Sequence, residues 1–204
     1  GTAVACDVTD AAQVAALAEA VGNRCDLLLN NAGVARFGPF DSHEDADVDL
    51  QLDINIKGVL NGIAAVLPIM NEQKSGQIIN ISSIGGLYVV PTGAVYCATN
   101  YAVRAISDGL RQENDRLRVT CVYPGVVESE LANTITDAAA ATAWAARSWG
   151  DAGEAIQLTG QSGQPYSGRI YAIKNGSTAP PGKAIAILSN SLRTAYGWEH
   201  PVNS

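Results

Sequence analysis

The sequence predicts an α/β fold: a doubly wound parallel sheet with helices on both faces. Short apolar runs alternate with longer segments of helical periodicity, which is typical of repeated strand–helix–strand units. Polar or glycine-rich clusters, NNAG, SSIGG and YPGVVES, each follow an apolar run. Ligands of such sheets bind beyond the carboxyl ends of the strands, so these clusters mark the expected site.

The N-terminal stretch predicts a strand followed by a helix. Residues 2–8, TAVACDV, are apolar and β-branched, which favours a strand. Residues 9–22 have apolar side chains at helical spacing, with Thr9 or Asp10 as the N-cap and Gly22 as the stop. The chain therefore begins with one strand–helix unit.

Three further strands and two helices follow. CDLLLNNAGV predicts a buried parallel strand that ends in a polar loop. Residues 44–74 show helical periodicity over about half of that span, and the helix is expected to close near Gly76. GQIINISSIGG predicts the next strand, AVYCATNYAVRAISDGLRQEN the next helix, and RVTCVYPGVV a strand that ends at its Pro-Gly turn.

The character of the chain changes from residue 136 onward. DAAAATAWAARSW is rich in alanine and favours a helix. Residues 150–182 are rich in Gly, Ser, Pro and Gln and have weak periodicity. GRIYAIKNG and GKAIAILS are interpreted either as two short strands or as surface segments without a fixed partner.

Composition narrows the function classes. The chain has 204 residues with 47% hydrophobic content, which fits one core. A net charge of −7 argues against nucleic acid and anionic membrane surfaces as partners. We expect a cytoplasmic protein, because the sequence has no signal-peptide layout and no apolar run near the roughly 20 residues that span a bilayer. The cysteines lack C-x-x-C spacing and there are only two histidines, so neither a disulfide framework nor a metal site is expected.

An ordered set of motifs over residues 3–131 resembles the short-chain dehydrogenase/reductase family. The motifs are CDVTD, NNAG, NIKG, NISS, the tyrosine helix and PGVVESEL. The resemblance implies a Rossmann-like sheet, NAD or NADP as cofactor, an alcohol or carbonyl as small-molecule substrate, and a homodimer or homotetramer. Residues 1–135 are then a partial dinucleotide-binding domain, and residues 136–204 a divergent tail of the same domain.

The resemblance also implies catalytic roles. Tyr96 matches the family's acid–base, and Ser83 matches the serine that hydrogen-bonds the substrate oxygen, with Ser82 the weaker candidate. Asn55 matches the helix asparagine that holds a water in the proton relay. The structural alternatives are a tyrosine packed in the core and an ordinary polar residue on an apolar helix.

Asn100 occupies the motif's lysine position, where the family uses a cation to favour tyrosinate and to bind the cofactor ribose. An amide imitates the hydrogen bond but not the charge. At a reference pKa of about 10, an unassisted Tyr96 is ionised about one part in a thousand at pH 7. Arg104 is no substitute, since it lies roughly 12 Å further along the helix axis. The resemblance therefore predicts an oxidoreductase whose acid–base catalysis by Tyr96 is weakened.

The remaining matches concern the cofactor. Asp7 and Val8 correspond to contacts with the adenine ring, the alternative being an acidic helix cap. A second group corresponds to the segment beside the adenosine ribose, where structural and binding roles overlap: Asn30, Asn31, Ala32 and Gly33. A third corresponds to the nicotinamide end, with Ser129 where the family has Thr: Pro124, Gly125, Val127 and Ser129.

The family's glycine-rich pyrophosphate turn does not occur in this sequence, and the resemblance places it upstream of Gly1. The fold is therefore expected to be incomplete at the N-terminus, through truncation, fragmentation or compensation by assembly. In the strand order 3-2-1-4-5-6, the strand at 2–8 would lack neighbours and the strand ending in NNAG would be an exposed edge. Two alternatives to an enzyme follow: a non-catalytic nucleotide-binding or scaffolding fragment, and a remnant that is unstable alone.

Overall fold

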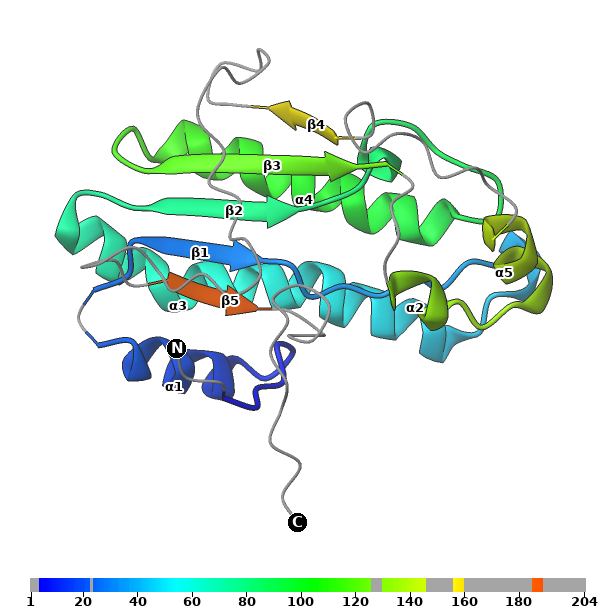
Figure 1. Cartoon of the computed structure of the whole chain (residues 1–204), viewed down its shortest axis with the longest axis horizontal. Coiled ribbons are helices and arrows are strands. Elements are labelled where there is room, and N and C mark those ends of the chain that lie inside the picture. Colours follow the sequence, from blue (N-terminus) through cyan, green and yellow to red (C-terminus); the bar gives the residue numbers. More distant parts are fainter. Residues whose placement is uncertain (1–3, 23, 126–129, 146–155, 160–184, 189–204) are drawn as a thin grey trace.

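The structure is a computed structural model that describes residues 4–22, 24–125, 130–145, 156–159 and 185–188. Strands and helices alternate through most of this part of the chain (Figure 1). The helices are α1 (Ala11–Ala20), α2 (Asp45–Leu52), α3 (Gly58–Gln73), α4 (Ala94–Glu113) and α5 (Ala138–Ala145). The strands are β1 (Leu27–Asn30), β2 (Gln77–Ile81), β3 (Arg118–Pro124), β4 (Ile156–Thr159) and β5 (Ile185–Leu188).

The strands form one sheet in the order β4-β3-β2-β1-β5. Strands β1, β2, β3 and β5 are parallel, whereas β4 runs antiparallel to β3. The carboxyl ends of the parallel strands therefore meet at one edge. That edge carries the polar clusters NNAG and SSIGG, as the sequence predicted.

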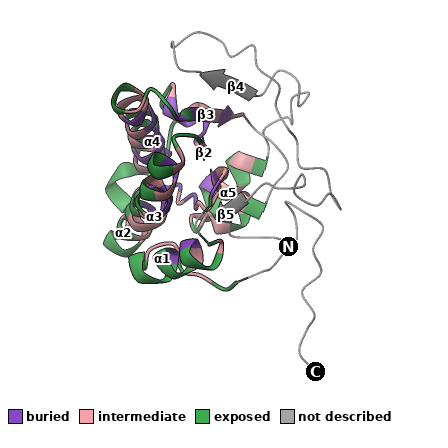
Figure 2. Cartoon of the chain, turned by 90° about the vertical axis from the view of Figure 1, so that its left-hand side faces the viewer, coloured by how far each residue is buried: buried purple, intermediate pink, exposed green. Residues whose placement is uncertain are grey.

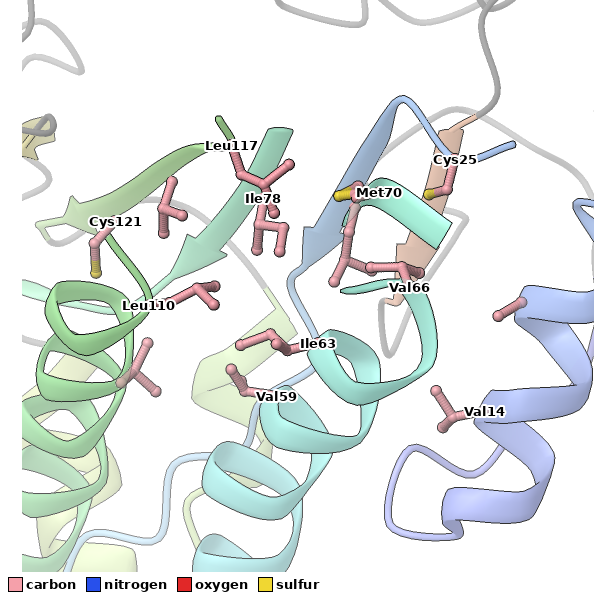
Figure 3. Packing of buried hydrophobic residues seen from close by; sticks show 14 of the residues in the cluster. Val14, Cys25, Val59, Ile63, Val66, Met70, Ile78, Leu110, Leu117 and Cys121 are labelled. Carbon is pink, nitrogen blue, oxygen red and sulfur yellow. The ribbon is translucent and has the colours of Figure 1, made fainter. Parts of the chain in front are cut away.

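The core lies between the sheet and helices α1, α3 and α4. Figure 3 shows Val59, Ile63, Val66 and Met70 on the face of α3 that turns toward the strands, where Ile78 of β2 lies. Because side chains alternate along a strand, Leu28 and Ile78 enter this core, whereas Leu29 and Ile79 point to the other face.

The helices α1, α3 and α4 all lie on one face of the sheet (Figure 2). On the opposite face, Leu29 and Ile79 are half-buried. Within the described part of the chain, α1, α3 and α4 therefore cover only one face of the sheet. The α/β class itself is confirmed. The expected helices on the second face are not among these three.

The N-terminal unit is partly corrected by the structure. Residues 4–7 have no strand conformation, contrary to the strand predicted over 2–8, of which residues 2 and 3 lie outside the described part. A strand needs a hydrogen-bonded neighbour, and no described strand pairs with this segment. The following helix is confirmed: Asp10 is its N-cap and accepts hydrogen bonds from the N–H groups of Ala12 and Gln13.

The expectation that β1 would be an exposed edge is wrong. Strand β5 pairs with it in parallel, with Leu28 opposite Ala186. The segment GKAIAILS thus contains a strand of the sheet, whereas GRIYAIKNG lies outside the described residues. Strand β5 therefore occupies the edge of β1 that was expected to be open.

The helical run Asp45–Gln73 corrects the expectation that no apolar run approaches the length that spans a bilayer. It is long and apolar enough, by length and composition, to cross a membrane, with a mean hydropathy of 1.4 over 18 residues. The core helix of a soluble protein passes the same test. Here the run supplies Val59, Ile63 and Val66 to the core, so its apolar character has a structural explanation.

Candidate active site

Ser83 and Tyr96 meet at the carboxyl end of β2. Ser83 follows β2, and its Oγ accepts a hydrogen bond of 3.1 Å from the N–H of Gly85. Tyr96 lies in the first turn of α4. A Cβ atom built on Gly85 would lie 3.5 Å from both Ser83 Oγ and Tyr96 Cε1. The serine hydroxyl and the tyrosine ring therefore flank one small residue, and the thirteen-residue spacing read from the sequence brings them together.

Tyr96 is buried, and its environment opposes ionisation. Burial raises the pKa of its phenol above the ordinary value of 10.0. Hydrogen bonding with the side chains of Ser83 and Asn100 lowers the pKa but does not outweigh burial. Tyr96 therefore remains a protonated phenol across neutral pH.

Aromatic rings cover the tyrosine. The centroids of Phe37 and Tyr96 lie 5.1 Å apart, and those of Phe37 and Trp144 lie 5.2 Å apart. Leu131 and Ile135 pack against the same cluster. The segment that contains α5 thus lies against the tyrosine through Phe37, a contact between residues that the sequence analysis did not single out.

Asn55 connects the loop after β1 to the tyrosine helix. Its Oδ1 accepts from the N–H of Val34 at 2.9 Å, and its Nδ2 donates to the carbonyl of Val34 at 2.9 Å and to Thr99 Oγ1 at 3.1 Å. Thr99 in turn donates to the carbonyl of Tyr96 at 2.8 Å. The amide is committed to positioning two elements, and the water-holding role implied by the resemblance stays a prediction.

The helix around Asn55 is locally widened. Residues 53–57 form a π-helical turn, in which the N–H of Gly58 donates to the carbonyl of Asp53, five residues earlier. Such turns occur often at functional sites, because they redirect side chains that a regular helix would place elsewhere. Here the turn coincides with the one buried residue of that segment, Asn55.

Asn100 lies on the Tyr96 face of α4 but supplies no charge. Its Nδ2 donates to the carbonyl of Tyr96 at 2.9 Å, and its Oδ1 accepts from Ser82 Oγ at 3.2 Å. Ser82 therefore faces Asn100, which agrees with its lower rank as a catalytic candidate. Arg104 pairs with Asp108 at 3.9 Å, so its charge is directed along the helix.

The residues expected near adenine are held by their own turn and by α3. Asp7 Oδ1 accepts hydrogen bonds from the N–H and the hydroxyl of Thr9, which closes the turn before α1. Asn61 Nδ2 donates to the carbonyl of Val8 at 2.9 Å. The acidic helix cap is Asp10 rather than Asp7, so that alternative to cofactor binding does not apply to Asp7 itself.

The NNAG segment divides into a structural half and a loop. Asn30 Nδ2 donates to Asn80 Oδ1 at 2.8 Å, and Asn80 Nδ2 donates to Ser107 Oγ at 2.9 Å. These buried contacts join β1, β2 and α4. Asn31, Ala32 and Gly33 are half-buried at the carboxyl edge, where a Cβ on Gly33 would lie 3.5 Å from Asn55 Oδ1.

The end of β3 completes the described edge. Pro124 and Gly125 are half-buried there. Val127 and Ser129, predicted at the nicotinamide end, lie outside the described residues. Among the residues that the structure describes, no group of three or more His, Cys, Asp or Glu could hold a metal ion.

Comparison with known proteins supports a common family and fold. Residues 2–140 match the family model described as short chain dehydrogenase. An uncharacterized oxidoreductase of Staphylococcus saprophyticus is 47% identical over 138 residues, which are 64% of this chain and 56% of that protein.

Two solved structures show the same architecture. A gluconate 5-dehydrogenase from Burkholderia cenocepacia, in complex with NADP and tartrate, is 36% identical with a TM-score of 0.61, over 68% of this chain and 56% of that chain. A short-chain dehydrogenase/reductase from Burkholderia phymatum, in complex with NAD, is 30% identical with a TM-score of 0.61, over 64% and 50%. The chain spans about half the length of the curated relatives it matches.

Proposed function

Because this chain belongs to the short-chain dehydrogenase family, we propose that it is an NAD- or NADP-dependent oxidoreductase that interconverts an alcohol and a carbonyl. Tyr96 is the acid–base and Ser83 the hydrogen-bond donor to the substrate oxygen. The observation that carries the proposal is the approach of these two side chains around Gly85.

The residues present fit the two ends of a dinucleotide at the carboxyl edge, but the glycine-rich turn that binds the pyrophosphate is not among them. Strand β1 is flanked by β2 and β5, which follow it in opposite directions across the sheet. Open α/β sheets bind ligands at such switch points. The residues that would hold the cofactor are Asp7, Val8, Asn31, Ala32 and Gly33 on the adenosine side, and Tyr96, Asn100, Pro124, Gly125, Val127 and Ser129 toward the nicotinamide. When bound, the nicotinamide supplies or accepts the hydride.

The chain's own groups favour carbonyl reduction at neutral pH. Ser83 donates a hydrogen bond to the substrate oxygen, which stabilises the negative charge that develops there. Tyr96 then donates its phenolic proton to that oxygen. The raised pKa of Tyr96 keeps this proton in place at pH 7. Alcohol oxidation needs tyrosinate instead, and Asn100 offers no cation to stabilise it.

A second candidate function rests on Asn100. Its amide is bonded to the carbonyl of Tyr96 and to Ser82, and a neutral amide does not activate a phenol as the motif lysine would. The chain would then be a non-catalytic nucleotide-binding or scaffolding domain. Substitution at this one position distinguishes the two candidates.

The experiment compares the chain with its Asn100→Lys and Asn100→Gln variants by nicotinamide absorbance. Lysine is expected to raise alcohol oxidation at pH 7 roughly 10²-fold, within the range of acid–base catalysis. Glutamine, which adds length without charge, is expected to give no such gain. Tyr96→Phe is expected to abolish turnover in either background. Folded Asn100→Lys protein without turnover would favour the non-catalytic candidate.

The pH dependence follows from the raised pKa of Tyr96. The oxidation rate of the unmodified chain is expected to rise continuously from pH 7 to beyond pH 10, because the tyrosinate fraction rises over that range. The reduction rate is expected to stay level across neutral pH. In Asn100→Lys the rise in oxidation should begin at lower pH; an unchanged profile would contradict Tyr96 as the base.

The proposal also covers the compartment, the oligomeric state and the partners of the protein. We place it in the cytoplasm as a homodimer or homotetramer, without nucleic-acid or membrane partners. Four free thiols, three of them buried, fit a reducing compartment: Cys6, Cys25, Cys97 and Cys121. The acidic balance of −7 disfavours phosphate-backbone partners. Light scattering of the purified chain tests the assembly.

A further inference from the structure

Three large apolar side chains are exposed on two neighbouring loops, and we call this set the apolar rim: Phe40, Tyr88 and Val89. Their exposed fractions are 79%, 51% and 62%. A single exposed apolar residue needs no explanation, whereas apolar residues gathered beside a reactive group mark a binding surface. The question is therefore whether the rim and Tyr96 belong to one site.

The two loops are joined by direct contacts. The N–H of Gly38 donates to the carbonyl of Thr92 at 2.9 Å. A Cβ atom on Gly93 would lie 2.7 Å from both Phe37 Cε1 and Val90 Cγ2, so the loops touch where that residue is small. Phe40 and Val89 therefore project from adjoining backbone.

The rim is continuous with the tyrosine. Phe37, three residues before Phe40, stacks on Tyr96 with ring centroids 5.1 Å apart. Val90, next to Val89, packs on the same cluster. The described members of that cluster around Tyr96 are uncharged: Ala35, Phe37, Val90, Cys97, Leu131, Ile135, Ala140 and Trp144.

The arginine on these loops, Arg36, is already paired, and the nearby carboxylates Asp41 and Glu44 are exposed. Arg36 Nε lies 3.1 Å from Asp47 Oδ1, and Asp47 Oδ2 accepts from Thr136 at 2.7 Å. His43, the titratable side chain beside Gly38, is half-buried, and its Nε2 has no partner among the described residues. The described residues of these loops thus offer apolar area, one imidazole nitrogen and exposed carboxylates, but no unpaired lysine or arginine for a carboxylate or phosphate.

From this arrangement we infer the class of substrate that Tyr96 serves: a carbonyl or alcohol attached to an uncharged aliphatic or aromatic body, which packs against Phe40, Tyr88 and Val89. The inference rests on the proposed function for the role of Tyr96. Apolar walls with a few convergent polar groups are the usual composition of small-molecule sites. Anionic or polyhydroxylated carbonyls would lose hydration on this surface without gaining a cationic partner.

Binding and turnover are measured separately. Acetophenone is titrated into the full chain by ligand-observed NMR, with pyruvate and dihydroxyacetone as charged and polar probes. We expect saturation by acetophenone at concentrations at least about tenfold lower than by the other two, since burying a side chain's worth of apolar area contributes roughly that factor. Equal or tighter binding of pyruvate or dihydroxyacetone overturns the inference.

Variants locate the binding. The double substitution Tyr88→Ser with Val89→Ser is expected to weaken acetophenone binding about tenfold. Leu60→Ser, which alters an exposed apolar residue of α3, is the matched control and should leave it unchanged. Identical binding by the rim variant and the unmodified chain contradicts the inference. A rim variant that turns a dimer into a monomer also contradicts it, because the rim would then be a contact between copies.

The two proposals fail in different ways. Rim-dependent binding of acetophenone without NADH- or NADPH-dependent reduction supports the apolar site and counts against the oxidoreductase. Reduction of pyruvate or dihydroxyacetone in preference to acetophenone supports the oxidoreductase and overturns the apolar site.

Discussion

The proposed catalytic side and the proposed adenosine side of the molecule are held in different ways. On the catalytic side, around Ser83 and Tyr96, buried polar groups bond across elements: Asn55 joins Val34 to Thr99, and Ser82 joins Asn100. On the adenosine side, residues 4–10 bond mainly within their own turn and to the start of α1, with one bond from Asn61 of α3. The acid–base geometry is thus fixed by the whole fold, whereas the adenine-side geometry is largely local.

If the catalytic side is held by bonds across elements, the largest loss of stability is expected on substituting Asn55. Asn55→Ala leaves the buried N–H and carbonyl of Val34 without the amide, so the free energy of unfolding is expected to fall by about 3 kcal/mol. Urea denaturation measures this loss. Asn55→Asp, which keeps one acceptor, should recover part of it; a loss below 1 kcal/mol for the alanine variant would show that the catalytic side is not held through this amide.

Gly86 tests how closely α4 approaches the end of β2. A Cβ there would lie 2.8 Å from Ser82 Oγ and 2.9 Å from the carbonyl oxygen of Asn100. Because backbone cannot yield cheaply, Gly86→Ala is expected to cost about 2 kcal/mol. Gly109→Ala is the control in α4 itself, since its Cβ meets nothing within 4 Å, and should stabilise the helix. Equal effects of the two substitutions would contradict the close approach.

Asn61 makes the side-chain bond between α3 and the adenosine side. Asn61→Ala removes its hydrogen bond to the carbonyl of Val8, for an expected loss of about 1 kcal/mol in unfolding free energy. If Val8 contacts the cofactor, Asn61→Ala should also raise the Kd for NAD or NADP, measured by calorimetry. The loss in binding free energy should then exceed the loss in unfolding free energy. An unchanged Kd would remove Val8 from the proposed adenine contacts.

Gly58 is the adenosine-side counterpart of Gly86. Its Cβ would lie 2.9 Å from Val8 Cγ2, the end of a side chain rather than backbone. Steric cost and the helix preference of alanine oppose each other, so Gly58→Ala is expected to change stability by less than about 1 kcal/mol. Thermal unfolding of both glycine variants gives the comparison directly. A larger loss for Gly58→Ala than for Gly86→Ala would reverse the assignment of rigid and local sides.

The smallest effect concerns the cap of α1. Hydrogen bonds from the Gln13 side chain and from the N–H groups of Gln13 and Ala12 lower the pKa of Asp10 below its ordinary value of 3.8. A lowered folded-state pKa stabilises the folded chain above pH 3.8, and this contribution is lost as the pH falls through the lower value. Asp10→Asn should remove this component from an acid-unfolding curve; superimposable curves would contradict it.

Much of the catalytic side could be predicted from sequence. Parallel strands bring their carboxyl ends to one edge, so the segment after β2 and the start of α4 had to place Ser83 near Tyr96. The contacts of Phe37, Thr99 and Trp144 could not be predicted in this way. They depend on how helices rotate against each other in the packed fold, and spacing along the chain does not specify that rotation.

The strand predicted over residues 2–8 and the edge predicted at β1 were wrong for one reason. Residues 4–7 have apolar character suited to a strand, but pairing requires a neighbour, and none of the described strands lies beside them. Ile185–Leu188, which had two interpretations, pairs with β1 instead. Local propensity could not rank these segments, because the outcome depends on which one reaches the sheet.

The pairing of β1 with β5 also affects how the chain reaches its native state. Strands β1, β2 and β3 lie within residues 27–124, but the outer side of β1 pairs only with Ile185–Leu188, much further along the chain. Such long-range closure is slow, and an unpaired parallel strand is a template for other nascent chains. Refolding yield should therefore fall steeply as protein concentration rises, because another chain can pair with β1 before β5 covers it.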